Sequence, residues 1–155
     1  PAPSTIVRPA THGSGMVHVR LSPVGRLVVA GAGLSVLALL LTASRLVPDP
    51  RGFGTHEQLG LTPCSFCRWT GRECPTCGAT TAWASVLRGE WSAALRANVA
   101  GTMLCLVAIV SVPWLLLSAS MGRWLIARPT MRVLLVAGSG LVAIAVLDWA
   151  RRVGF

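Results

Sequence analysis

The stretch ANVAGTMLCLVAIVSVPWLLLSASMG, residues 97–122, decides the class of fold, because it contains no charged residue over its whole length. A helix needs about 20 apolar residues to cross the roughly 30 Å hydrocarbon core of a bilayer. Trp91 and Trp124 flank the run, and indole rings prefer the two membrane–water interfaces. We therefore predict a transmembrane helix over residues 93–120.

Two further stretches have the same character. An uncharged run after Arg26 predicts a first span over residues 27–46, and another before Asp148 predicts a third span over residues 131–150. Arg132 and Asp148 lie at the two ends of the third run. We expect lipid headgroups around both side chains, because a charge near a helix end can reach the interface.

The composition agrees with these spans. Of the 155 residues, 53% are hydrophobic and only 12% are charged. Soluble domains carry about 25% charged residues, and a small domain cannot bury so much apolar surface by itself. The sequence therefore predicts an all-α membrane protein with about three transmembrane helices in the lipid bilayer, and a cysteine-bearing loop between the first and second spans.

The remaining segments follow from the spans. The first residues are rich in Pro, Ser, Thr and Gly without apolar periodicity, which predicts a tail that is flexible or held by a partner. These segments are the N-terminal tail 1–26, the cysteine loop 47–92 with a short helix over 80–88, a short basic loop 121–130 and the C-terminal tail 151–155.

The basic residues do not indicate nucleic-acid binding. The net charge of +9 comes from arginines that are scattered and mostly flank apolar segments, whereas nucleic-acid binding needs a clustered basic patch. Anionic lipid headgroups and other membrane protein subunits are the expected counterparts. The candidate contact residues in the loop and at its end are Arg51, Arg68, Arg72, Arg88 and Arg96.

The arginines only weakly favour one membrane orientation. Three spans place the N-terminus and the short loop 121–130 on one side, and the cysteine loop and the C-terminus on the other. Short loops and helix ends carry most weight in the positive-inside rule. On that basis we predict a multi-pass protein with the N-terminus in the cytoplasm and the cysteine loop outside; for a bacterial chain, this membrane would be the inner membrane.

The loop carries four of the five cysteines, in the spacing Cys64-x2-Cys67-x6-Cys74-x2-Cys77. The fifth, Cys105, is alone inside an apolar run and is expected to act as a small hydrophobic residue. Three interpretations of the four loop cysteines stay open.

The first interpretation is a metal site. Two CxxC turns can supply four thiolates in a tetrahedron, which suits zinc or iron. The stretch Cys74-Pro75-Thr76-Cys77-Gly78 has the form of the knuckle in rubredoxins and zinc ribbons, whereas Arg68 takes the place of that glycine after Cys67. Zinc is the cofactor that this interpretation predicts.

The second interpretation is structural disulfide bonding, because an exported loop lies in an oxidising compartment and needs a covalent staple to hold its shape. The third is redox catalysis by Cys74 and Cys77. A helix over 80–88 would place Cys77 just before a helix N-terminus, where the pKa of a thiol falls. Enzymes that pass electrons from such loops to a quinone generally use four helices, whereas three spans are evident here.

The loop also contains an ordered set of short motifs: Pro-Cys-x-Phe, Thr-Gly, Cys-Pro-x-Cys-Gly-x-Thr, Gly-Glu and Ala-x-x-x-Asn. The residues that form them are Pro63, Cys64, Phe66, Thr70, Gly71, Cys74, Pro75, Cys77, Gly78, Thr80, Gly89, Glu90, Ala94 and Asn98. With these motifs the chain resembles a small bacterial integral-membrane family of unknown function, and residues 49–61 resemble its planctomycete-type members. The resemblance implies membrane location and no particular activity.

The chain departs from the family pattern at three positions. The family usually has arginine where Thr81 stands and proline where Val99 stands, and Cys67 is not part of its core. Three shared cysteines do not complete a tetrahedral site, so the resemblance alone does not imply four thiolate ligands.

Taken together, the sequence favours a non-enzymatic accessory or structural subunit of a larger membrane complex. Its cysteine loop would be made rigid by disulfides or by a metal, with Cys64, Cys67, Cys74 and Cys77 as the candidate residues. The alternative is a membrane thiol–disulfide oxidoreductase that uses Cys74 and Cys77.

Overall fold

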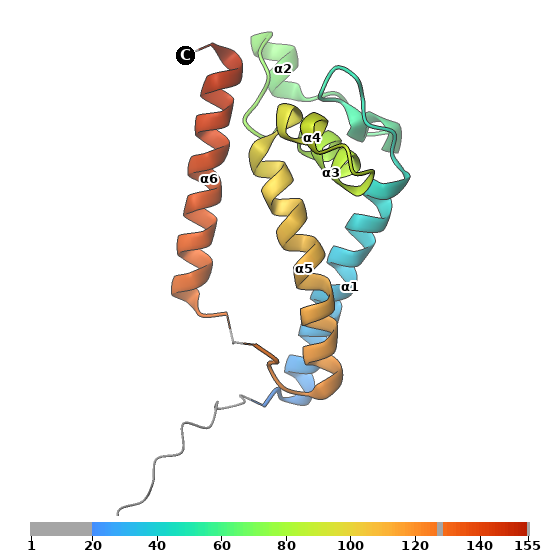
Figure 1. The fold of residues 1–155 in the computed structure, drawn as a ribbon, viewed down its shortest axis with the longest axis vertical. Coiled ribbons are helices and arrows are strands. Elements are labelled where there is room, and N and C mark those ends of the chain that lie inside the picture. The colour runs from blue at the N-terminus through green and yellow to red at the C-terminus, as the bar shows by residue number, and fades with distance from the viewer. Residues whose placement is uncertain (1–19, 127–128, 155) are drawn as a thin grey trace, which may run out of the picture.

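The computed structural model describes residues 20–126 and 129–154, so most of the predicted tail 1–26 lies outside the described residues. Within these ranges the chain forms six α-helices and one 3-10 helix and contains no strand, which confirms the all-α prediction (Figure 1). The elements are α1 (Pro23–Arg45), η1 (Thr55–Leu59), α2 (Ser65–Thr70), α3 (Ala79–Leu87), α4 (Trp91–Ala97), α5 (Val99–Met121) and α6 (Met131–Val153).

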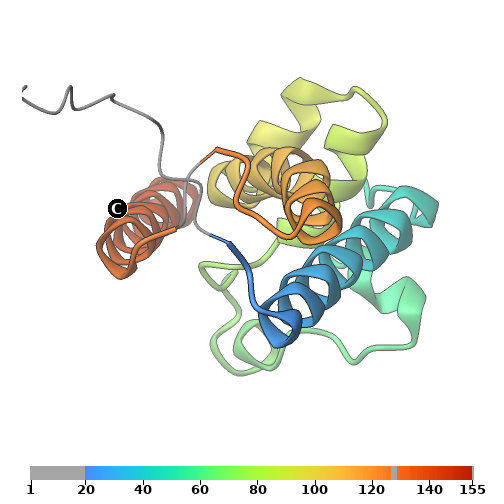
Figure 2. The same ribbon diagram turned by 90° about the horizontal axis from the view of Figure 1, so that it is seen from below.

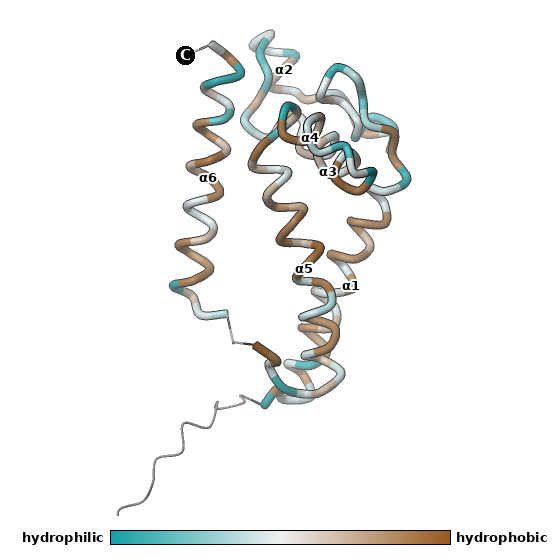
Figure 3. Tube along the Cα trace, viewed as in Figure 1, coloured by the Kyte–Doolittle hydropathy of each residue, from teal (hydrophilic) through white to brown (hydrophobic). Residues whose placement is uncertain are grey.

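Helices α1, α5 and α6 are long and apolar enough to cross a membrane, which confirms the three predicted spans. Figure 3 shows the hydrophobic colour along all three helices and the polar colour at their ends. A helix is stable in lipid because it satisfies its own backbone hydrogen bonds. Side-chain caps begin α1 and α6, since Ser22 accepts the Gly25 amide at 3.0 Å and Thr130 accepts the Val133 amide at 3.4 Å.

The second long helix begins later than the sequence indicated. We expected one span over 93–120, but Trp91–Ala97 is a separate helix, α4, and α5 begins only at Val99. Between them Asn98 has an extended backbone, with φ −168° and ψ 112°, and its side chain accepts the Gly101 amide at 2.6 Å. Asn98 is therefore the N-cap of α5, and a cap ends one helix as it starts the next.

Helices α1 and α5 pack closely against each other. A Cβ atom at Gly33 of α1 would lie 2.8 Å from the Leu116 side chain of α5, so the small residue permits the close approach. Cys105 is fully buried here, as expected for a small hydrophobic residue. The buried cluster that joins α1, α3, α4 and α5 consists of Leu40, Ala82, Val86, Ala94, Ala97, Cys105, Ala108 and Val112.

At the end remote from the cysteines, the start of α1 is tied to the end of α5. The Arg26 guanidinium donates hydrogen bonds to the carbonyl oxygens of Ala119 at 2.9 Å and Ser120 at 3.0 Å. A cation at a helix C-terminus also interacts favourably with the helix dipole. The Arg26 hydrogen bonds therefore join α1 and α5 at one end, and the cysteine loop joins them at the other.

Helix α6 stands apart from the other two spans, as the view from below shows (Figure 2). Every residue of its first ten positions, 131–140, is exposed, and Asp148 is its only buried residue. We expected lipid headgroups around Asp148. Protein surrounds this carboxylate instead, because it accepts the backbone amide of Val99 at 3.3 Å and pairs with arginines of its own helix.

The loop between α1 and α5 folds over the ends of both helices as a cap, at the same end as the C-terminus (Figure 1). The sequence predicted one short helix in it over 80–88, and α3 spans Ala79–Leu87. The cap also contains η1, α2 and α4, which the sequence pattern did not predict. The Arg88 guanidinium links this cap to α1, because it donates a hydrogen bond at 2.9 Å to the carbonyl oxygen of Leu46, just past the end of that helix.

Candidate metal centre

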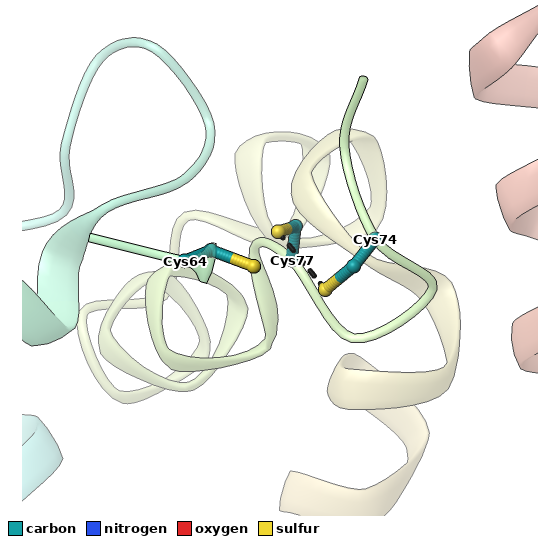
Figure 4. Close-up of side chains that lie close together, drawn as sticks. All are labelled: Cys64, Cys74 and Cys77. Atoms are coloured by element: carbon teal, nitrogen blue, oxygen red, sulfur yellow. Dashed lines mark hydrogen bonds between the residues drawn. The ribbon is translucent and has the colours of Figure 1, made fainter. Parts of the chain in front are cut away.

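The four loop cysteines converge, with each pair in its own turn. The sulfurs of Cys64, Cys74 and Cys77 all lie within 4.8 Å of one another, and in Figure 4 these three side chains point toward a common space. The Sγ of Cys77 lies 3.1 Å from that of Cys74 and 3.2 Å from that of Cys67. Cys77 therefore contacts one sulfur of its own pair and one of the other.

All four are free thiols in the structure. A disulfide joins its sulfurs at about 2.05 Å. Four thiolates bonded to one Zn²⁺ at about 2.3 Å have sulfurs about 3.8 Å apart. The two sulfur–sulfur contacts, at 3.1 and 3.2 Å, are shorter than this separation. The 4.8 Å within which the three sulfurs lie is longer than it. The sulfurs of Cys64, Cys74 and Cys77 are therefore close to the spacing of metal ligands, whereas the Cys67 sulfur contacts Cys77 but lies outside this three-sulfur group.

The second turn, from Cys74 to Gly78, is fixed by its own backbone and by close packing. The Cys77 amide donates to the Cys74 carbonyl at 3.0 Å. Gly78 has φ +84°, and a Cβ atom there would collide with the carbonyl oxygens of Ala97 and Gly52. Only glycine combines a positive φ with so close a backbone approach. The knuckle-like pattern in the sequence thus corresponds to a tight turn packed against the end of α4.

The first turn begins helix α2. Cys64 is the N-cap residue and Cys67 lies in the first turn, while Gly71, with φ +68°, ends the helix and donates its amide to the Cys67 carbonyl at 3.0 Å. None of the residues in α2 is buried. The first cysteine pair is therefore positioned by a short exposed helix, and the second by a turn that packs on the core.

Two side chains from the membrane helices hold the backbone of the second turn. The Asn98 amide nitrogen donates to the carbonyl oxygens of Pro75 at 3.1 Å and Cys77 at 3.0 Å. The Arg152 guanidinium reaches the same two oxygens, at 3.4 Å from Pro75 and 3.3 Å from Cys77. In the sequence, Asn98 is only one residue of the family-like motifs, and no pattern marks Arg152, which lies 75 residues beyond Cys77.

Arg152 belongs to a small polar network at the end of α6. It forms ion pairs with Glu73 at 2.6 Å and with Asp148 at 3.2 Å. Trp149 adds a hydrogen bond from its indole nitrogen to the Glu73 carbonyl at 2.6 Å. The residue just before the second turn is therefore bound to α6 through both its side chain and its backbone.

The pKa values of Cys64 and Cys77 are shifted in opposite directions. Burial raises the pKa of the Cys77 thiol because desolvation of the thiolate dominates, which is the opposite of the lowering expected from the helix that follows it. The backbone amide of Cys67 lowers the pKa of the Cys64 thiol to about 7, through a contact too loose to count as a helix cap. Without metal, Cys64 is the more readily ionised of the two.

A cavity of about 270 Å³ lies beside the sulfurs. Cys64, Cys67 and Cys77 line one part of it, and Arg68 and His56 line another. His56 is thus near the thiols without belonging to the three-sulfur group. The cavity gives solvent and small reagents access to the site from one side.

The predicted lipid or partner contacts have different surroundings. Arg51 is paired with Asp49 at 2.7 Å and with Glu57 at 3.7 Å, and the Arg88 contact is internal to the fold. The other three predicted contact residues are all exposed, namely Arg68, Arg72 and Arg96. Their role in binding a partner stays a prediction. The hydroxyl of Thr81 forms a hydrogen bond with that of buried Thr55 at 2.8 Å.

Comparison with protein families gives one match. The family described as "Protein of unknown function (DUF2752)" matches residues 64–112, about a third of the chain. Comparisons with curated proteins and with solved structures give no significant match. The matched segment contains all four loop cysteines and Asn98, and it ends within α5, well before Arg152. From Cys64 to Val112, the chain is therefore similar to a protein family of unknown function.

Proposed function

We propose that the protein is a non-enzymatic subunit of a larger membrane assembly, and that its four loop cysteines bind one Zn²⁺ that fixes the cap over α1 and α5. The contact of the Cys77 sulfur with both Cys74 and Cys67 carries this proposal. Two independent disulfides would need only the sulfurs within each pair to meet. One metal ion needs sulfurs from both pairs in one place.

The ligand set supports a structural role. Cys64, Cys74 and Cys77 supply three thiolates, and Cys67, in contact with Cys77, supplies the fourth. Four thiolates suit zinc or iron, and a zinc site with four protein ligands leaves no position for water or substrate. Such a site holds a fold together and has no open position for catalysis.

Metal binding would supply much of the stability of the cap. Structural zinc binds zinc-finger peptides with an apparent free energy of about 10–16 kcal/mol at pH 7, against about 5–15 kcal/mol for the net stability of a whole domain. Helix α2 buries none of its residues, so hydrophobic packing contributes little to holding the first cysteine pair. Metal–sulfur bonds would hold this cysteine pair in place of hydrophobic packing.

The exposed surface of the cap supports the subunit role. Trp69 of α2 is 88% exposed, and Phe66 and Arg68 of the same helix are exposed as well. Aromatic and arginine side chains are the residues most enriched at protein interfaces. We propose that α2 contacts a partner subunit or the headgroups next to it, and that the loop lies on the outer side of a bacterial inner membrane. Bound metal would keep its thiols from pairing as disulfides there.

The test is elemental analysis of protein purified natively in mild detergent. We expect one zinc per chain, five cysteines that can be alkylated after denaturation with a chelator, and loss of zinc in Cys77→Ser. Cys105→Ala is the matched control, since Cys105 is buried in the span far from the loop in sequence, and this variant should keep its zinc. Metal-free wild-type protein with disulfides between the loop cysteines would refute the proposal.

A second candidate is a thiol–disulfide oxidoreductase with Cys74 and Cys77 as the active pair. The 3.2 Å contact between Cys67 and Cys77 favours it, because a dithiol relay also needs sulfurs of two pairs in contact. For this candidate the purified protein would be metal-free, and a Cys74–Cys77 disulfide would form and open reversibly under mild reductant. Loss of both cysteines would then stop the activity without lowering the amount of protein in the membrane.

A further inference from the structure

We propose that Arg152 is a positioning residue of the metal centre and that α6 belongs to this centre, although the family similarity ends at residue 112. This inference rests on the proposed zinc site. Arg152 contacts no cysteine sulfur. It acts on the backbone that carries two of the ligands, Cys74 and Cys77.

The carbonyl oxygens of Pro75 and Cys77 each receive two donors. Asn98 approaches them from the start of α5 and Arg152 from the end of α6, at 3.0–3.1 Å and 3.3–3.4 Å respectively. A carbonyl has two lone pairs, so both donors can bind it at once. The turn is held between two membrane helices, and its freedom to rotate the Cys77 sulfur away from the other thiols is reduced.

Arg152 is itself held in place. Its side chain is 11% exposed and pairs with Glu73 at 2.6 Å and with Asp148 at 3.2 Å. Asp148, whose side chain is 4% exposed, is in turn bound by the Val99 amide at 3.3 Å. Because two carboxylates hold the guanidinium in place, it is a fixed, directional hydrogen-bond donor to the two turn carbonyls.

The polar contacts of helix α6 are concentrated at its end. Residues 131–140 are all exposed, and the polar contacts with other described elements come from Asp148, Trp149 and Arg152. These contacts reach the second cysteine turn and the start of α5. The end of α6 and the metal turn therefore stabilise each other, and a change in one is transmitted to the other.

The test measures the zinc affinity of the purified full-length chain by competition with a chromophoric chelator. Replacing residues that orient metal ligands typically lowers metal affinity about 10–100-fold. We expect Arg152→Gln to fall in that range. Arg151→Gln is the matched control, because Arg151 is the next residue of the same helix and also pairs with Asp148, at 2.8 Å, but is 64% exposed. This control should bind zinc with an affinity close to that of the wild type.

Two further measurements separate positioning from general stability. The visible absorption bands of the Co²⁺-loaded protein should change in Arg152→Gln and stay unchanged in Arg151→Gln, since these bands report the geometry of the sulfur ligands. Arg152→Lys keeps the charge for Glu73 and Asp148 but lacks the planar fork that reaches two carbonyls, so its affinity should lie between those of Arg152→Gln and the wild type. If Arg152→Gln does not accumulate in the membrane, the zinc affinity and Co²⁺ bands of Arg152→Lys provide the test instead.

The outcomes distinguish the two proposals. Wild-type protein that binds no metal overturns the zinc site and this inference with it. Wild-type protein that binds zinc, together with Arg152→Gln or Arg152→Lys of unchanged affinity and unchanged Co²⁺ bands, leaves the zinc site standing and overturns the role of Arg152.

Discussion

A comparison of Gly78→Ala with Gly89→Ala tests the packing of the second cysteine turn. Both glycines have nearly the same backbone, with φ +84° and φ +79°, and both lie in the cap. They differ in their surroundings. A Cβ atom at Gly78 would meet the backbone carbonyls of Ala97 and Gly52, whereas a Cβ atom at Gly89 has nothing within 4 Å.

The magnitude follows from this difference. A left-handed backbone costs a residue with a Cβ atom about 1–2 kcal/mol, and this cost is common to both variants. At Gly78 the colliding atoms are backbone and cannot rotate away, so overpacking adds about 1–3 kcal/mol or more. For a chain of this length, 1 kcal/mol corresponds to about 2–4 °C in the melting temperature. We therefore expect Gly78→Ala to melt on the order of 5 °C below Gly89→Ala.

The assay is thermal unfolding of the two variants and the wild type in the same detergent, at the same protein concentration and with equal zinc supplied. We also expect Gly78→Ala to hold less zinc, because the collision moves the residue next to Cys77. Equal melting temperatures for the two variants would show that the second turn does not pack against α4 as described. The position of Cys77 in the described site would then be wrong as well, because this turn carries Cys77.

Three further results are expected. Asn98→Ala should lower the free energy of unfolding by about 2–4 kcal/mol, seen in denaturant titration, because it removes the cap of α5 and leaves two turn carbonyls with one donor fewer; a loss below 1 kcal/mol would contradict this. In metal-stripped, reduced protein, the alkylation rate of Cys64 should rise as the pH passes through about 7 and then level off, while Cys77 stays slow because its pKa is raised; equal rates at pH 7, measured by mass spectrometry of the peptides, would disagree. A reporter enzyme that is active only outside the cytoplasm should be active when fused to the C-terminus, since three spans put that end on the side of the cysteine loop; an inactive but well-expressed fusion would reverse the orientation.

The three spans could be predicted because the physical signal is local. A run without charge that is long enough to cross a bilayer has few other stable conformations in a small chain. The boundary of the second span was missed for an equally local reason. Asn98 is uncharged and does not interrupt the apolar run, yet its side chain caps α5 and its extended backbone ends α4. Composition does not show which of several polar residues caps a helix.

The site could be predicted only in part. The CxxC spacing identified the four cysteines as a group, but metal, disulfide and redox interpretations all need the same spacing. The convergence of the two pairs depends on how α2 packs relative to the second turn, and that is a tertiary feature. The contacts of Arg152 with Pro75 and Cys77 join residues more than seventy positions apart, and neither periodicity nor spacing carries information over that distance. Burial likewise decided the pKa of Cys77 against the expectation from helix position.

The most direct test of the metal centre is X-ray absorption at the zinc edge on natively purified protein. We expect one shell of four sulfur atoms at about 2.3 Å from the zinc. A shell of nitrogen or oxygen atoms at about 2.0–2.1 Å, or a sample without zinc, would contradict it.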